Sequence, residues 1–436
     1  MTVDIEKVVS LSKRRGFIFQ SSEIYGGLAS SWDYGPLGVE LKKNIKDAWW
    51  KEMVYAREEI FGLDASILMH PKVWEASGHT QNFSDPYLIC TDCHKYYRQD
   101  SPEVKDNRCP LCGRNFSSQA TRANLMLETY LGPLKETALK VYLRPETAQG
   151  IFVNFTNILF TKHPKLPFGI AQIGKAFRNE ITTGNFTFRS REFEQMELEY
   201  FVPPEEDEQY YEYWISQRLN WYINLGIKKE NLRLRKHSQD ELAHYAKACT
   251  DIEYNFPFGW MELEGIANRK DFDLRQHSQF SGIDLTYFDD QKRIRFYPYI
   301  IEPSGGVDRS LLAFLIDAYR EEKVRGEKRV VLGLDKRLAP IKVAVLPLLT
   351  NRPEIVEMAK KISGELKRSF VTTYDDTAGI GRLYRRQDEI GTVYCVTVDV
   401  QSLEDKKVTV RDRDTMLQER ISVDKLKEYL AEKLGM

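Results

Sequence analysis

The apolar positions of the longer, N-terminal part of the chain predict both helices and strands. Between 39 and 55, apolar side chains recur at helical spacing, directly after a Gly-Pro-Leu-Gly segment that interrupts regular structure. This pattern predicts a long amphipathic helix. Short apolar runs at 141–202 and 249–301 predict strands, and the aromatic segment at 208–225 predicts a second helix. The last run leads through two glycines into a helix that we expect to continue through Tyr319.

A charged segment without clear periodicity, 322–340, ends this part of the chain. Beyond it, runs of strand length alternate with amphipathic segments, which is typical of a sheet covered by helices. We therefore predict a separate α/β domain at 339–436, because a segment of this size can fold around its own core. Within it we predict strands at 343–346, 370–374, 393–398, 408–411 and 416–421, and helices at 353–368, 380–387 and 423–434.

Composition excludes several classes of protein. The chain has 436 residues, of which 42% are hydrophobic and 29% charged, and a disordered chain would be poorer in apolar residues. The 63 basic and 64 acidic residues give a net charge of −1, which argues against a surface that is basic throughout but not against a local basic site. The sequence has neither an apolar stretch of about 20 residues nor a signal-peptide pattern, and its six cysteines are too sparse for a disulfide scaffold. We therefore expect a cytoplasmic protein.

Two Cys-x-x-Cys pairs lie in a segment, 86–122, that is poor in aliphatic residues. The pairs are separated by 15 residues, which is within the spacing of four-thiolate zinc sites. Each such turn directs two sulfurs toward one point, and two turns complete a tetrahedron around Zn²⁺. We predict an inserted module with a structural zinc ion, the alternative being redox-active or vestigial pairs without metal. The predicted ligands are Cys90, Cys93, Cys109 and Cys112.

The densest group of charged and aromatic residues lies between 177 and 197. Two strand-like segments flank a polar loop that contains Gly-Asn, which predicts a hairpin whose arginines stand on one face of a sheet. An Arg/Glu-rich hairpin is commonly no more than a salt-bridged surface. The order of residues is more specific here, because arginines, carboxylates and one aromatic recur at set intervals: Arg178, Glu180, Arg189, Phe193 and Glu197.

A second element joins a strand to a helix at 301–309. Adjacent glycines at such a turn let a phosphate approach the backbone and the N-terminus of the helix. Gly305, Gly306 and Arg309 form this pattern, which by itself is equally typical of a helix cap or a tight turn.

Together these two elements resemble motifs 2 and 3 of the class II aminoacyl-tRNA synthetases. The helix at 39–55 and the following Pro71 resemble motif 1, which forms the dimer interface in that class. The resemblance runs from about residue 13 to the C-terminus, where the chain is similar to the family's anticodon-binding domain. Four further segments look like the dimeric glycyl-tRNA synthetases: 32–38 (WDYGPLG), 73–79 (VWEASGH), 143–150 (LRPETAQG) and 262–267 (ELEGIA).

The resemblance implies both a fold and a reaction. The fold would be a mixed α/β protein, with an antiparallel-sheet class II catalytic domain at 1–338, the zinc module inserted at 86–122, and an α/β anticodon-binding domain at 339–436. The enzyme would activate glycine with ATP and transfer it to the 3′ end of tRNA(Gly). The implied cofactors are ATP, Mg²⁺ and structural Zn²⁺. The implied partners are tRNA(Gly), glycine and a second copy of the chain, bound through motif 1.

By the same resemblance, two arginines would be catalytic. Arg178 would contact the α-phosphate and the glycine carboxylate, and Arg309 would contact the γ-phosphate. Arg189 would bind the ATP tail, Phe193 would stack on adenine, and Glu180 would recognise the adenine amino group. The implied ATP-binding set is Arg178, Asn179, Glu180, Phe188, Arg189, Ser190, Arg191, Glu192, Phe193, Glu262, Leu263, Gly306, Val307, Asp308 and Arg309.

A second implied set would bind glycine. Glu146, Glu197, Glu302 and Ser304 match the family's amino-acid pocket, where carboxylates would hold the ammonium group and leave little room beside the α-carbon. Glu262 and Glu302 are both candidates for Mg²⁺ contact, because ATP-bound Mg²⁺ commonly uses one or two carboxylates. Arg98 matches a substrate position but is alternatively a solvated charge of the zinc module. The full set is Arg98, Glu146, Phe193, Glu194, Gln195, Met196, Glu197, Glu302, Pro303, Ser304, Gly305 and Gly306.

Two residues depart from the family pattern. Met261 stands where Gly is expected and would tighten or reshape the pocket, and Gly305 stands where Ala is expected and would loosen it. In the tail, Arg382, Arg385 and Arg386 form a basic cluster on a predicted helix. Contact with tRNA and an ordinary solvated helix face are equally good interpretations of that cluster.

Two other functions fit parts of the pattern. A non-catalytic relative, such as the DNA polymerase accessory subunits that resemble this family, should have lost the arginines and pocket carboxylates, and this chain retains them. A synthetase for threonine, proline or histidine would share the Arg-Pro-Glu-Thr segment. The zinc module and the pocket residues Glu146, Glu197 and Ser304 favour glycine.

Overall fold

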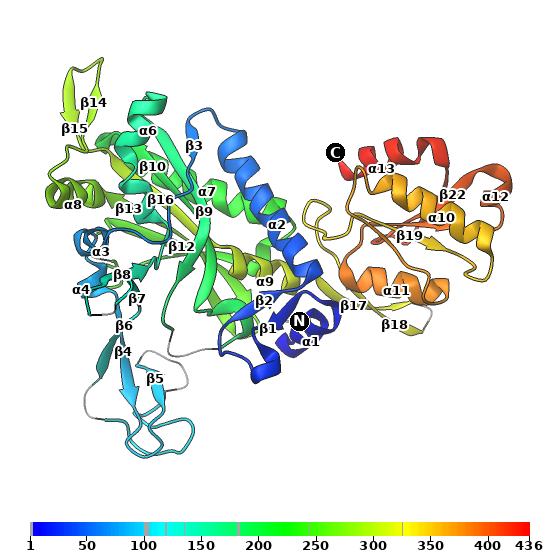
Figure 1. Cartoon of the computed structure of the whole chain (residues 1–436), viewed down its shortest axis with the longest axis horizontal. Helices are drawn as coiled ribbons and strands as arrows, with labels where there is room; N and C mark the ends of the chain where they lie inside the picture. The colour runs from blue at the N-terminus through cyan, green and yellow to red at the C-terminus, as the bar shows by residue number, and fades with distance from the viewer. Residues whose placement is uncertain are drawn as a thin grey trace.

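A computed structural model describes residues 3–99, 104–117, 120–134, 136–180, 184–243, 245–324 and 326–436, without the side chain of Arg98. Figure 1 shows a large body that contains the N-terminus and a smaller body that contains the C-terminus. In the described part of the chain, no helix is both long and apolar enough to cross a membrane.

The large body is built on a seven-stranded sheet. The strand order is β11-β12-β13-β16-β10-β9-β3, and every neighbouring pair is antiparallel except β3 and β9, which are parallel. This arrangement confirms the predicted antiparallel-sheet class. The strands are β3 (Ile60–Gly62), β9 (Phe168–Phe177), β10 (Glu192–Val202), β11 (Leu232–Lys236), β12 (Ala248–Phe256), β13 (Gly259–Lys270) and β16 (Tyr299–Gly306).

Helices cover the two faces of this sheet unequally. On one face, α2 (Pro36–Trp50), α7 (Asp207–Asn224) and α9 (Val307–Ala318) pack with alternate strand residues into the main hydrophobic core. On the other face, α5 (Ala148–Phe152), α6 (Phe155–Lys162) and α8 (Phe272–Ser281) build a smaller core around Phe168 and Phe201. The rest of that second face remains open. The predicted helices are present, and the one at 39–55 continues past α2 as a π-helical turn, Lys51–Tyr55.

Shorter elements complete the large body. A three-stranded sheet carries the cysteine segment, and Figure 1 shows that it projects from the body. Its strands are β4 (Ser84–Ile89), β5 (Tyr96–Arg98) and β6 (Thr121–Asn124). The other elements are α1 (Ile5–Arg15), β1 (Ile18–Gln20), β2 (Trp32–Tyr34), α3 (Pro71–Ala76), α4 (His79–Asn82), β7 (Leu127–Leu131), β8 (Leu139–Leu143), β14 (Tyr287–Asp289) and β15 (Ile294–Phe296).

The small body contains the strands and helices expected from the alternating pattern. Its sheet has the order β20-β19-β21-β22-β23, with a parallel centre and antiparallel strands at one edge. The strands are β19 (Val343–Pro347), β20 (Thr372–Tyr374), β21 (Tyr394–Val398), β22 (Lys407–Asp412) and β23 (Gln418–Ser422). The helices are α10 (Pro353–Leu366), α11 (Ile380–Ile390), α12 (Ser402–Asp405) and α13 (Leu426–Leu434).

The segment predicted to be irregular, 322–340, is partly a hairpin. β17 (Tyr319–Val324) pairs with β18 (Glu327–Leu332), and the helix expected to continue through Tyr319 ends at Ala318. Charged side chains conceal the strand pattern. Arg329 pairs with Glu322 across the ribbon, and Arg320 pairs with Asp414 of the small body.

A buried ionic contact joins this hairpin to the small body. Arg329 of β18 is fully buried, and its guanidinium lies 2.8 Å from Asp388 of α11 and 2.7 Å from Glu322 of β17. Arg411 of β22 is 2.9 Å from the same Asp388. The two bodies therefore share one compensated cluster of buried charges.

We predict that Arg329→Met destabilises the protein by about 3–5 kcal/mol, because Glu322 and Asp388 lose a buried counter-charge. The free energy of denaturant unfolding measures the change. The matched control is Lys328→Met on the same strand. Lys328 is exposed and pairs with Glu321, so its replacement should lower the free energy of unfolding by less than about 1 kcal/mol. Equal losses in the two variants would contradict the prediction.

Candidate active site

A cavity of about 310 Å³ lies on the open face of the central sheet. Strands β10, β13 and β16 form its floor, and residues from 178–180, 187–190, 237–243 and 245–251 complete its walls. Side chains alternate along a strand, so the residues of β10 and β16 that point into the cavity alternate with residues such as Met196 and Ile301 that enter the main core. The cavity-facing residues of these two strands are Phe193, Gln195, Glu197, Glu302, Ser304 and Gly306.

The loop between β9 and β10 carries the first group of arginines. Phe177 and Glu192 are the last paired residues of the hairpin, so Arg178 follows one strand and Arg189 precedes the other. The predicted hairpin is present, but these arginines lie in its connection and not on a strand face as expected. Residues 181–183 of this connection lie outside the described part of the chain.

Arg178 lies among aromatic rings at the cavity wall. Its Nε donates to the carbonyl of Pro145 at 3.1 Å, and its guanidinium carbon is 5.2 Å from the ring centroid of Phe83 and 5.3 Å from that of Phe193. Neither Arg178 nor Arg189 forms an ion pair within the described residues. Their positive charge is therefore available to an anionic ligand.

Arg309 enters the cavity from the first turn of α9. Its guanidinium carbon lies 4.5 Å from the centroid of the Phe188 ring, and its Nη1 lies 3.1 Å from a carboxylate oxygen of Glu262. A β-bulge at Leu263 turns Glu262 toward the cavity. These contacts gather positive charge and aromatic surface at one end of the cavity.

Glu197 occupies the opposite end. Its carboxylate accepts hydrogen bonds from the Thr147 backbone at 2.9 Å, the Thr147 hydroxyl, Gln195 at 2.8 Å and Ser304 at 2.6 Å. Burial and the nearby charge of Glu146 raise its pKa above the ordinary value. Four donors on one carboxylate leave it little freedom to rotate.

Glu146 lies beside Glu197 and is held by a histidine. The Glu146 carboxylate is 3.2 Å from Nε2 of His79 and accepts from Gln149 at 3.0 Å. Burial alone would raise the pKa of Glu146, but His79, Arg269 and Gln149 together lower it below the ordinary value. This carboxylate is therefore held in its charged form.

Glu302 is the third carboxylate at this end. Nη1 of Arg269 lies 2.8 Å from it, and Arg269 also binds Asp273 and stacks 3.8 Å from the ring centroid of Tyr245. Burial raises the pKa of Glu302 to about 8, and Arg269 offsets only part of that rise. The protonation of Glu302 is therefore sensitive to a cationic ligand.

The cavity thus combines two opposed electrostatic environments. Its arginine end suits phosphates and a carboxylate, because guanidinium groups bind both in bidentate fashion. Its carboxylate end suits a small ammonium group, because three buried acids surround a limited volume. An α-amino acid and a nucleoside triphosphate together suit both ends. The triphosphate and the amino acid's carboxylate match the arginine end, and its ammonium group matches the carboxylate end.

Two family models match the chain. One, described as the tRNA synthetase class II core domain (G, H, P, S and T), matches residues 134–319, and the other, described as an anticodon binding domain, matches 342–433. The glycine–tRNA ligase of Thermobifida fusca is 53% identical and covers 99% of this chain and 98% of its own length. That of Geobacillus kaustophilus is 51% identical and covers 100% of both chains. The chain belongs to the glycine–tRNA ligase family.

Membership of this family confirms the resemblance inferred from the motifs. The cavity brings together most of the residues that the motifs suggested. The predicted residues that line it are Glu146, Arg178, Glu180, Phe188, Arg189, Ser190, Phe193, Gln195, Glu197, Glu262, Glu302, Ser304, Gly306, Asp308 and Arg309.

Other residues of the predicted ligase site do not line the cavity. Contiguous stretches of motif include residues on both faces of a strand, and only one face meets the cavity. Met196, Leu263 and Val307 are buried in the main hydrophobic core. The side chain of Arg98 lies outside the described part of the structure. The remaining predicted residues that do not line the cavity are Asn179, Arg191, Glu192, Glu194, Pro303 and Gly305.

The two departures from the family pattern act away from the cavity. A Cβ on Gly305 would lie 2.9 Å from Glu264, whose buried carboxylate pairs with Arg218 behind the sheet. Met261 packs against the main core. The expectation that Gly305 loosens the pocket is therefore wrong, because this position faces the core, where glycine makes room for the ion pair.

Several buried residues that support the carboxylates are not among the predicted site residues. Thr147 and Gln149 stand in the quoted segment 143–150, and His79 ends the segment 73–79, so the motifs themselves carried that signal. Arg269 stands in no quoted segment. Arg269 lies at a second bulge in β13, between Asn268 and Lys270, and its guanidinium pairs with Glu302.

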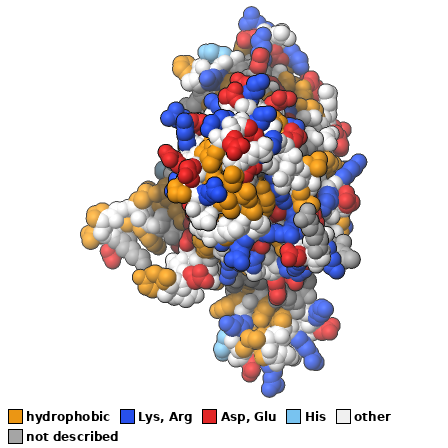
Figure 2. Space-filling model, turned by 90° about the vertical axis from the view of Figure 1, so that its right-hand side faces the viewer, with side chains coloured by type: hydrophobic (Ala, Val, Ile, Leu, Met, Phe, Trp, Pro, Cys, Tyr) orange, Lys and Arg blue, Asp and Glu red, His pale blue; other side chains and the backbone are white. Residues whose placement is uncertain are grey.

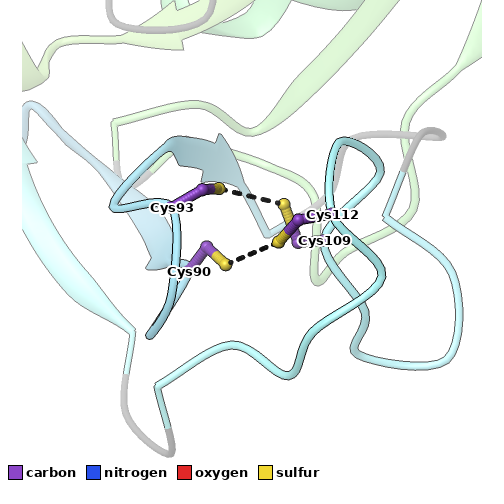
Figure 3. Close-up of side chains that lie close together, drawn as sticks. All are labelled: Cys90, Cys93, Cys109 and Cys112. Carbon is purple, nitrogen blue, oxygen red and sulfur yellow. Dashed lines mark hydrogen bonds between the residues drawn. The ribbon is translucent and has the colours of Figure 1, made fainter.

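The four predicted zinc ligands lie together in the projecting module (Figure 3). The sulfurs of Cys90 and Cys112 are 3.4 Å apart, those of Cys93 and Cys109 are 3.6 Å apart, and none is in a disulfide. Four converging thiols are a donor set that suits tetrahedral Zn²⁺.

We predict that the stability of Glu302→Gln relative to wild type increases as the pH rises from about 5 to 8. The folded pKa of about 8 exceeds the ordinary 4.5, so the native state retains a proton that the unfolded state has lost in this interval. The contribution of Glu302 to the stability of the wild-type protein therefore falls as the pH rises. The difference in melting temperature between the variant and wild type measures the effect. A difference that is independent of pH, as expected for the exposed control Glu192→Gln, would contradict it.

Proposed function

We propose that this protein is a glycine–tRNA ligase, which activates glycine with ATP to glycyl-adenylate and transfers the glycyl group to the 3′ end of tRNA(Gly). The observation that carries the proposal is one cavity with arginines at one end and carboxylates at the other, in a chain that matches glycine–tRNA ligases over its whole length.

The arginines would serve the first step, in which a glycine carboxylate oxygen attacks the α-phosphorus of ATP and pyrophosphate leaves. Two anions approach each other and negative charge grows on the phosphate, so fixed positive charge and correct placement lower the barrier. Arg178 would bind the α-phosphate and the glycine carboxylate, Arg189 the ATP tail, and Arg309 the γ-phosphate. Phe193 would stack on adenine, and Glu180 would accept from its amino group.

The carboxylate end would select glycine. Glu146, Glu197 and Glu302 would surround the ammonium group, and the bonds from Thr147 and Ser304 would keep Glu197 from moving aside. A methyl group usually changes binding by only about 1–3 kcal/mol in a pocket that can adapt. A carboxylate held by four donors adapts poorly, which supports exclusion of alanine by steric clash.

Mg²⁺ bound with ATP would neutralise part of the phosphate charge. Glu262 and Glu302 are the two candidate ligands. Glu262 is half exposed beside Arg309, where the γ-phosphate is proposed to lie, whereas Glu302 is buried against Arg269. This arrangement favours Glu262 as the direct ligand.

The second step and its partners complete the proposal. We propose domains at 1–338 and 339–436, with the second binding the anticodon region of tRNA(Gly), and a homodimer formed through motif 1 around α2. Figure 2 shows positive and negative side chains interspersed on the face it presents, so tRNA contact would depend on local groups. On α11, Arg386 pairs with Asp375, while Arg382 is exposed. We place the protein in the cytoplasm, where thiols stay reduced.

The rival functions have less support. A non-catalytic accessory subunit would not need three arginines placed around one cavity together with three buried carboxylates. Synthetases for threonine, proline or histidine share the class II core. The two relatives described above, at 51–53% identity, are both glycine–tRNA ligases.

We predict glycine-dependent exchange of pyrophosphate into ATP, and its loss in Arg178→Ala, because that variant lacks the cation at the reacting phosphate. The control is Lys175→Ala, which removes an exposed cation at the end of β9 that is paired with Glu192, and it should retain exchange. Size measurement and thermal unfolding should show both variants folded. Exchange with an amino acid other than glycine would refute the substrate, and near-normal exchange in Arg178→Ala would refute its role.

We also predict about one zinc atom per chain in protein purified without chelators, since four thiolates form one tetrahedral site. Elemental analysis of wild type and of Cys112→Ser measures it, and the variant should lose most of the metal. The matched control is Cys249→Ser, which changes a cysteine outside the cluster and should leave the zinc content unchanged. Metal-free wild type with four titratable thiols in the module would contradict the proposed zinc site.

A further inference from the structure

A buried ionic cluster lies between α2 and the point where β16 becomes α9. The ammonium group of Lys42 is 2.8 Å from Asp308 and 2.9 Å from Glu194. The Tyr34 hydroxyl donates to the same oxygen of Asp308 that Lys42 contacts, and the lysine nitrogen lies 4.1 Å from the centroid of the Tyr34 ring. These four residues, here called the Lys42 cluster, also line a hollow of about 340 Å³ next to the cavity.

One hydrogen bond of the cluster takes the place of backbone pairing between β10 and β16. Pairing between β10 and β16 reaches Gln195 and Gly306 and stops there, because α9 begins at the next residue. The backbone N–H of Glu194 therefore lies beyond the paired residues of β16. It donates instead to the second carboxylate oxygen of Asp308, at 2.7 Å. The Asp308 side chain thus continues the strand pairing for one more residue.

This bond links two chain positions that matter for ATP. Phe193, proposed to stack on adenine, immediately precedes Glu194. Arg309, proposed to bind the γ-phosphate, immediately follows Asp308. The distance between the stacking ring and the arginine is therefore constrained by the Asp308–Glu194 contact.

Lys42 is the charge that makes this contact stable. The side chains of Lys42, Asp308 and Glu194 are only 12%, 6% and 15% exposed, so solvent screens them poorly. Lys46 also approaches Glu194, at 3.0 Å. Of the described lysines and arginines, only Lys42 is within ion-pair distance of Asp308. Without Lys42, the carboxylates of Asp308 and Glu194 would repel each other and weaken the hydrogen bond between the Glu194 backbone and Asp308.

We propose that Lys42, supported by Tyr34, is a positioning residue that sets the separation of Phe193 and Arg309 and thereby the affinity for ATP. This inference rests on the proposed function of the cavity. Neither residue belongs to the sets that the motif resemblance assigned to ATP or glycine. The helix that carries Lys42 therefore contributes to the nucleotide site without touching the nucleotide.

The decisive experiment compares Lys42→Met with Lys43→Met in glycine-dependent pyrophosphate exchange. Lys43 is the adjacent residue on α2, is exposed, and among the described residues forms an ion pair only with Asp47. In Lys42→Met the KM for ATP should rise about tenfold or more, whereas the KM for glycine should change by less than about twofold. In Lys43→Met both values should stay within about twofold of wild type.

Tyr34→Phe supplies a second, milder variant, because it removes one hydrogen bond to Asp308 and keeps the ring. It should raise the KM for ATP in the same direction by a smaller factor, with unchanged melting temperature and molecular size. An unchanged KM for ATP in folded Lys42→Met and Tyr34→Phe would overturn the inference. A rise in both KM values together with a fall in kcat and in melting temperature would also overturn it, because that combination is the signature of a purely structural role.

Failure of the proposed function would look different. Wild-type protein would then show no glycine-dependent exchange at all, and equilibrium dialysis with ATP alone would replace the kinetic assay. Weaker ATP binding by Lys42→Met than by Lys43→Met would still support the positioning role. Equal ATP binding by the two variants would overturn it.

Discussion

The antiparallel pairing of β10 with β16 is the contact on which the rest of the site depends. Its register places Glu197 opposite Ser304 and Gln195 opposite Gly306. A slip of one residue would move every second side chain to the other face, exchanging cavity residues for core residues. The core prevents such a slip, because Met196 and Val307 are fully buried beneath the cavity floor. Hydrophobic packing on one face therefore sets the chemistry of the other.

The three buried carboxylates of the site are tolerated because each has hydrogen-bond or ion-pair partners. Glu146, Glu197 and Glu302 are buried close together, an arrangement that is unfavourable for stability by itself. His79 and Arg269 offset part of this cost, and hydroxyl and amide donors hold the oxygens. A bound ammonium group would offset more. The arrangement is typical of a site that gives up stability to bind a specific ligand.

Much of the fold follows from local patterns. The helix at 39–55, the strands on either side of Arg178 and Arg189, and the strand and helix order after Pro340 all appear where the periodicity indicates them. The hairpin after α9 was missed because its charged side chains resemble a solvated linker. Arg329 is fully buried there only because Asp388, far away in sequence, lies beside it. No local signal identifies such a pair.

The sequence by itself determined the family, the four cysteines and most of the groups that line the cavity, because these residues stand in contiguous motifs whose order is specific. Only the tertiary structure decided which residue of each motif faces the cavity. Glu194 follows Phe193 in the same motif, yet it points to Lys42 on α2. Likewise, Gly305 makes room for Glu264 behind the sheet. The physical reason is that strand alternation, two bulges in β13 and the packing of α2 and α9 depend on contacts between segments far apart in the chain.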